Sequence, residues 1–115
     1  MGGGVRVYPN ASVRRVVAFV PPGHMHVRLV LELEDQTLVL QEATVAAIVR
    51  AYASVALHPS RRAVELVSRR LGRGERKPLF AEWQLVESGR GEEEVIEWAL
   101  GVLEGAETVE PRGEG

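Results

Sequence analysis

The chain has 115 residues, of which 45% are apolar and 26% are charged, and it contains no cysteine. A chain of this length can bury one core without disulfides, and the missing cysteines exclude disulfides, thiolate metal sites and cysteine nucleophiles. The net charge is only −2, and no apolar run approaches the ~20 residues that a membrane-spanning helix needs, so we expect no membrane association.

The two ends of the chain differ in composition from the middle. Residues 1–4 and 105–115 are rich in glycine, glutamate and proline and offer little apolar surface, so we expect a flexible N-terminus and a flexible acidic tail around one domain at 5–104. The absence of cysteine fits the cytoplasm. Arginine outnumbers lysine thirteen to one, which suggests either a thermostable protein or a biased genome.

The first half of the chain predicts an antiparallel meander. Residues 13–20 are rich in β-branched side chains and end at Pro21-Pro22-Gly23, a sequence that breaks the strand and permits a reversal. Residues 26–34 alternate between apolar and polar side chains, and 37–41 return after an Asp35-Gln36 turn. Such alternation is typical of a sheet with one buried face, and 5–8 adds a possible short strand.

The second half predicts three helices and one strand. Residues 43–57 carry an apolar stripe at helical spacing, and their opposite side is mostly alanine and serine. Residues 60–71 follow Pro59, with Ser60 as the N-cap and Gly72 as the stop. A strand at 79–86 and a helix at 92–104 complete the chain. We therefore predict an α+β fold, an antiparallel sheet of three to four strands with about three helices on one face, in the order β-β-β-α-α-β-α.

Charge is sorted along this second half. Residues 58–78 hold seven basic and two acidic side chains, a net of +5, whereas residues 79–115 carry a net of −8. Guanidinium groups match phosphate oxygens, so the basic block predicts contact with the backbone of RNA or DNA. A solvated face, or neutralisation by the acidic last third, are the competing interpretations. The basic residues are Arg61, Arg62, Arg69, Arg70, Arg73, Arg76 and Lys77.

More specific chemistry has weaker signals. The helix pair at 43–57 and 60–71 loosely resembles a helix-turn-helix, but it lacks the glycine that such turns often contain. His24 and His26 supply two imidazoles where a zinc site needs three or four ligands, so we expect no metal. No P-loop, nucleophile elbow or dinucleotide fingerprint is present. We expect no cofactor and no catalysis, although a dispersed active site stays open.

Two surfaces predict self-association. The small side of helix 43–57 suits close packing against another helix, and valines occupy the otherwise polar face of the sheet. We therefore expect a small intracellular, non-enzymatic binding protein that contacts nucleic-acid backbone. The alternative is a homo-oligomeric protein–protein adaptor with complementary basic and acidic patches. The residues predicted for self-association are Ala47, Ala51, Ser54, Val30 and Val39.

Overall fold

The computed structural model describes residues 4–72, 74 and 82–112. The fold is α+β, as predicted, with an antiparallel sheet and helices. Two compact units divide the chain, and each is considered by itself. The first comprises Met1–Glu42 and Trp98–Gly115, and the second comprises Ala43–Glu97.

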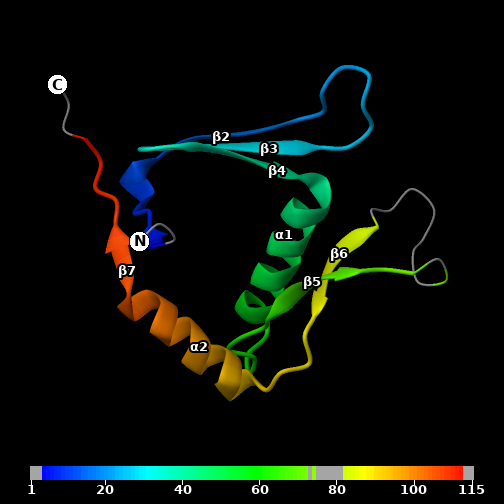
Figure 1. The fold of residues 1–115 in the computed structure, drawn as a ribbon, viewed down its shortest axis with the longest axis vertical. Helices are drawn as coiled ribbons and strands as arrows, with labels where there is room; N and C mark the ends of the chain where they lie inside the picture. The colour runs from blue at the N-terminus through cyan, green and yellow to red at the C-terminus, as the bar shows by residue number, and fades with distance from the viewer. Residues whose placement is uncertain (1–3, 73, 75–81, 113–115) are drawn as a thin grey trace. The chain divides into compact units, whose positions relative to one another are not determined.

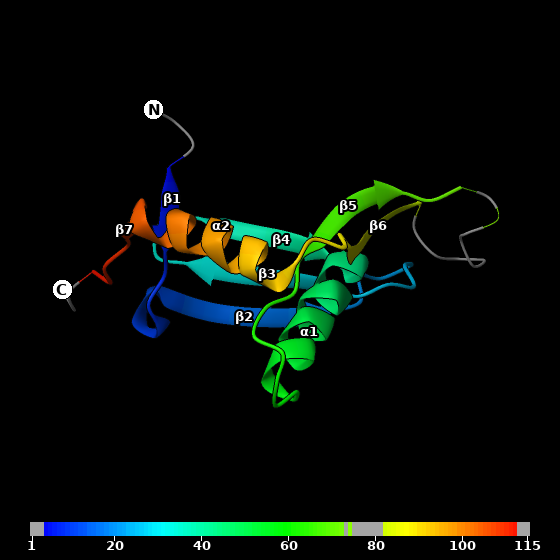
Figure 2. The same ribbon diagram turned by 90° about the horizontal axis from the view of Figure 1, so that it is seen from below.

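The predicted meander is confirmed in the first unit (Figures 1 and 2). Strands β2 (Val13–Phe19), β3 (Arg28–Leu33) and β4 (Thr37–Gln41) pair antiparallel in the order β2-β3-β4. The reversal between β2 and β3 is closed by a hydrogen bond from the His24 N–H to the Pro21 carbonyl, 3.0 Å. Gly23 has a φ of 80°, a conformation that glycine adopts without strain in such a turn.

A second pairing in this unit joins the two ends of the chain. Strand β1 (Val5–Val7) lies parallel to β7 (Ala106–Thr108), which falls within the segment predicted as a flexible tail. A short 3-10 helix, η1 (Asn10–Ser12), leads from β1 toward β2. Ser12 is fully buried, and its hydroxyl donates to the Val109 carbonyl at 2.6 Å. The chain ends are therefore tied together by backbone pairing that spans about a hundred residues of sequence.

Helix α1 (Glu42–Ala56) confirms the prediction for 43–57 to within one residue. Its burial pattern differs from the expected one, however. Ile48, Val49 and Tyr52 of the apolar stripe are exposed, whereas Ala47, on the side predicted to pack closely against another helix, is only 2% exposed. Within the second unit, the Arg50 guanidinium donates to the Leu85 carbonyl at 2.8 Å and so fixes α1 to the strand that contains Leu85.

The prediction of a helix at 60–71 is wrong. Residues 58–65 are turn and irregular chain, and β5 (Leu66–Arg70) follows as a strand. β5 pairs antiparallel with β6 (Trp83–Glu87), with Ser68 opposite Leu85. Residues 60–71 contain only three apolar side chains at helical spacing, Val64, Val67 and Leu71. Burying these three in a helix stabilises the segment less than pairing with a strand that satisfies its backbone hydrogen bonds.

The last helix, α2 (Glu92–Glu104), has the predicted bounds. The strand predicted at 79–86 is observed as β6 from residue 83 onward, and 79–81 lie outside the described residues. In the described part of the chain there are two α-helices rather than about three, and antiparallel sheets of three and two strands. The order from β2 onward is therefore β-β-β-α-β-β-α-β, which corrects the predicted order.

Candidate functional site

The basic block becomes a loop and a strand edge rather than one helix face. Arg61 and Arg62 lie in the irregular segment before β5, and Arg69 and Arg70 lie at the end of β5. Arg73, Arg76 and Lys77 lie outside the described residues. A strand sends successive side chains to opposite faces, so Arg69 and Arg70 do not extend one continuous basic surface.

Glutamates of the acidic third lie against three of these arginines. Arg61 contacts Glu87 at 2.8 Å, and Arg62 lies 3.8 Å from Glu92. Arg70 pairs with Glu82, the residue directly before β6. The antiparallel pairing of β5 with β6 sets Arg70 opposite Trp83 and so brings it next to Glu82. Three of the four described arginines of the block therefore lie against glutamates, and contact of the block with nucleic-acid backbone stays a prediction.

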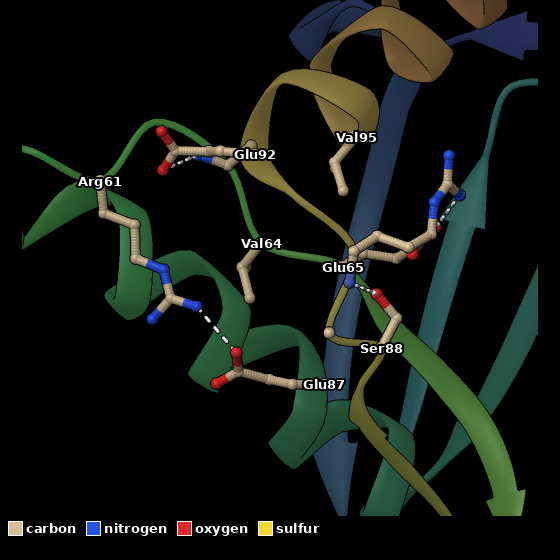
Figure 3. A pocket seen from close by; sticks show the side chains of 10 residues that line it. Arg61, Val64, Glu65, Glu87, Ser88, Glu92 and Val95 are labelled. Carbon is tan, nitrogen blue, oxygen red and sulfur yellow. Dashed lines mark hydrogen bonds and ion pairs between the residues drawn. The ribbon is translucent and has the colours of Figure 1, made fainter.

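A pocket of about 160 Å³ lies beside these ion pairs, within the second unit. Figure 3 shows Val64 between the Arg61–Glu87 pair and Glu65. Arg90 donates to Glu65 at 3.1 Å, and the Ser88 hydroxyl accepts from the Arg90 N–H at 3.1 Å. The pocket is lined by Arg61, Ala63, Val64, Glu65, Glu87, Ser88, Gly89, Arg90, Glu92 and Val95.

Glu92, one of the lining residues, connects α2 to the loop before β5. Its carboxylate accepts hydrogen bonds from the backbone N–H groups of Arg62, 2.9 Å, and Ala63, 3.4 Å. The Arg62 N–H, followed by the Ala63 N–H and the nearby guanidiniums, holds the pKa of Glu92 below its ordinary value. The charged form of Glu92 thus holds the Arg62–Ala63 loop against the start of α2.

The pocket offers little else for chemistry. Its cations and carboxylates are largely paired with one another, and one oxygen of Glu65 is buried without a hydrogen-bond partner in the described structure. The described residues contain no cluster of three or more His, Asp or Glu side chains that could hold a metal ion. The pocket is therefore a junction at which ion pairs connect the loop before β5, the end of β6 and the start of α2.

His26, one of the two neighbouring histidines, contacts a carboxylate. His26 Nδ1 lies 2.7 Å from Glu42 Oε1, at the start of α1, and the Val27 N–H donates to the other oxygen of Glu42 at 3.3 Å. The hydrogen bond with His26, together with that from Val27, lowers the pKa of Glu42. One carboxylate thus links the end of the β2–β3 connection to the first residue of α1.

Sequence reasoning missed a polar cluster at the β3–β4 turn. Tyr8 donates to Asp35 at 2.7 Å and accepts from Gln36 at 2.8 Å, and Arg6 also pairs with Asp35. The Tyr8 hydrogen bond is the largest influence that holds the pKa of Asp35 low, and Arg6 adds to it. No spacing in the sequence signals this cluster, because Tyr8 and Asp35 are brought together only by the fold.

The predicted association residues of the sheet do come together. Val30 on β3 lies opposite Val17 on β2 and Val39 on β4, so the three valines form one row across the sheet. Val39 is 62% exposed and Val17 is 40% exposed. We name this side the valine face. Its remaining members are Arg15, Glu32 and Thr37 at one end, and Phe19, Arg28 and Gln41 at the other.

We name the opposite side of the sheet the leucine face. Neither of its two central rows contains a charged residue. Those rows are Val16, Leu31 and Leu38, then Ala18, Leu29 and Leu40. On the small side of α1, Ala47 is buried and Ala51 and Ser54 are half-buried, and self-association through this side stays a prediction. Ser54 also uses its hydroxyl to donate to the Arg50 carbonyl at 2.8 Å.

Neither helix in the described part of the chain is long and apolar enough to cross a membrane. No protein-family model, curated protein or solved structure matches the chain. A proposal for its function therefore depends on the geometry of the two units.

Proposed function

We propose that the chain is a non-catalytic protein-interaction protein and that the valine face of its sheet is the contact surface. The observation that carries the proposal is the row of Val17, Val30 and Val39, which places two exposed valines and one half-buried valine in the middle of a face with charged ends. Protein interfaces combine an apolar centre with a polar rim in this way.

The two sides of the sheet differ in the cover that they suit. An antiparallel sheet with one solvated side normally has polar side chains along that side. Here both sides have apolar centres. The central rows of both faces are apolar, and Val16 on the leucine face is 57% exposed. The valine face differs in having Arg15, Glu32 and Arg28 at its ends, the charged rim that suits a reversible protein contact.

The nucleic-acid alternative has less support from the geometry. Arg61, Arg62 and Arg70 each contact a glutamate. A phosphate would have to displace those carboxylates, although exposed ion pairs are individually weak and can be displaced. Nucleic-acid binding by this block stays a prediction.

Single cysteines test the interaction proposal cleanly, because the chain has none of its own. In V39C the thiol replaces the most exposed valine of the valine face. We expect a maleimide to label it readily in dilute pure protein and slowly once a protein partner is present, whether concentrated chain or a protein fraction of cell extract. The matched control is Glu107→Cys on β7, whose labelling rate should change little.

Two outcomes contradict the proposal. The thiol of V39C could resist labelling at every dilution, which would mean that the chain covers its own valine face. It could instead label at the same rate in all conditions, including with extract and with concentrated chain. Protection that disappears when the extract proteins are first digested separates a protein partner from small molecules.

A further inference from the structure

We propose that the partner on the valine face is a second copy of this chain, related by a two-fold axis that passes over Val30 and runs across the strands. This inference rests on the proposed function and names the partner at the same surface. It is carried by the order of charges on the central strand. β3 presents Arg28, Val30 and Glu32 on the valine face, a cation and an anion at equal distances on either side of an apolar centre.

This order makes the face complementary to itself. In a two-fold dimer the same patch is used on both copies, so each group must meet its own complement. Reversing β3 over Val30 sets Arg28 of one copy against Glu32 of the other, and does so twice. The other two-fold arrangement, with the axis along the strands, would set Arg28 on Arg28 and Glu32 on Glu32, which like-charge repulsion disfavours.

The flanking strands fit the same reversal. Val17 of β2 and Val39 of β4 are level with Val30, so each meets its own counterpart near the axis. Arg15, which pairs with Glu32 of its own copy at 3.0 Å, then lies over Phe19 of the other copy, and a guanidinium over an aromatic ring is attractive. Glu32 therefore meets two cations in the dimer, Arg15 of its own copy and Arg28 of the other. Thr37 and Gln41 complete the ends of β4 without adding charge.

The size of the face sets the strength of the dimer. Three strands about 4.8 Å apart and five residues long give a contact of roughly 15 Å by 16 Å. This is about 240 Å² on each copy and roughly 480 Å² in all, well below the ~1,200 Å² total of the smaller stable interfaces. We therefore expect a weak, reversible dimer with a dissociation constant toward the millimolar range. Since three charged groups of each copy lie at its ends, Arg15, Arg28 and Glu32, we also expect the dimer to weaken as salt is raised.

Charge exchange on β3 tests the pairing. We expect Arg28→Glu and Glu32→Arg each to weaken self-association by roughly tenfold or more, because each sets like charges against each other twice. The double variant R28E/E32R restores a cation and an anion in reversed order and should bind itself more tightly than either single variant. It should stay weaker than the original chain, because the pair of Glu32 with Arg15 of the same copy is lost. An equal mixture of R28E and E32R should form a heterodimer. Sedimentation equilibrium up to about millimolar concentration measures all four, and E107R is the control for a charge change elsewhere.

Several results would overturn the second copy as partner. These are a strict monomer at the highest concentration, a dimer that R28E leaves unchanged, or a double variant no better than the two single ones. Circular dichroism and denaturant unfolding of each variant identify any that fail to fold, and the mixing experiment does not depend on matched stabilities. If V39C is protected by an extract protein but not by concentrated chain, the interaction function stands and the second copy is excluded.

Discussion

Asp35 is the single aspartate in the sequence, which makes its environment directly measurable. The Tyr8 hydroxyl donates to it at 2.7 Å and is the main reason for its low pKa. Tyr8→Phe removes that donor, so we expect the pKa of Asp35 to rise toward its ordinary value. Selective carbon-13 labelling of aspartate gives one carboxyl resonance to follow by NMR across pH. Tyr52→Phe, on the exposed side of α1, is the control and should leave the titration where it was.

Glu92 predicts a pH dependence of stability with a defined sign. Its pKa is lower in the folded chain than the ordinary value of 4.5, because the N–H groups of Arg62 and Ala63 donate to the carboxylate. The folded state therefore gains stability from Glu92 above pH 4.5, and that gain is lost as pH falls through the lower folded pKa.

We expect Glu92→Gln to remove this part of the acid sensitivity, so that the free energy of unfolding falls less steeply below pH 4.5. Urea unfolding at a series of pH values measures it. E93Q removes the same charge one residue further along α2 and shows how much of the change is general. An identical pH profile for E92Q and E93Q would mean that the hydrogen bonds to Arg62 and Ala63 do not stabilise the charged form.

The segment at 60–71 offers a test of strand against helix. Ser68 is exposed on β5 opposite Leu85, so a β-branched side chain there should pack across the strand pair. We expect Ser68→Val to be more stable than Ser68→Ala by about 0.5 kcal/mol, within the ~1 kcal/mol span of strand preferences. A helix would give the reverse order. We expect that reverse order at Glu97 on α2, where the free energy of unfolding of E97A should be higher than that of E97V by about 0.5 kcal/mol. Denaturant unfolding of the four variants decides it.

Two glycines should respond to alanine with opposite signs. Gly101 lies inside α2, where a Cβ would meet nothing within 4 Å, so Gly101→Ala should stabilise by about 0.5–1 kcal/mol. Gly89 lies between β6 and α2 with a φ of 85°, so G89A should destabilise by about 1 kcal/mol or more. Thermal or denaturant unfolding gives both values. Stabilisation by G89A would mean that the loop adopts another conformation in solution.

The elements show which parts of a fold a sequence can predict. β4 and α2 were predicted with their observed bounds, because short-range alternation and a run of glutamates at a helix start are local signals. β5 was not predicted, because its strand conformation depends on pairing with β6. The local sequence of β5 does not show that such a partner lies further along the chain. β7 was missed for the same reason, since its partner β1 is about a hundred residues away.

The candidate sites divide in the same way. Val30 and Val39 were predicted to share a surface because period-two alternation alone places them on one side of the sheet, and the register sets them level. The pairing of Arg61 with Glu87 could be raised only as a possibility, because opposite charges in separate segments meet only when the strands are paired. The Tyr8–Asp35 contact had no sequence signal at all.

At the scale of the whole molecule, opposite charges from separate segments of the chain lie close together. The chain separates a basic block from an acidic one, yet Glu82, Glu87 and Glu92 lie against Arg70, Arg61 and Arg62. Cancelled charge releases few counterions when it meets a phosphate backbone, so affinity for duplex DNA should be weak and only mildly dependent on salt. The triple variant E82Q/E87Q/E92Q exposes three cations without adding any.

We expect that variant to bind duplex DNA more tightly at low salt, with a salt slope steeper by about two to three, close to 0.9 for each phosphate newly contacted. Fluorescence anisotropy across a salt series measures the slope. E93Q/E94Q/E97Q changes the net charge equally at three other glutamates of α2 and separates local pairing from total charge. An equal gain in both variants would show that the ion pairs do not matter. A steep slope in the original chain would instead favour the nucleic-acid function over the interaction function, because it would mean that phosphates displace those three glutamates unaided.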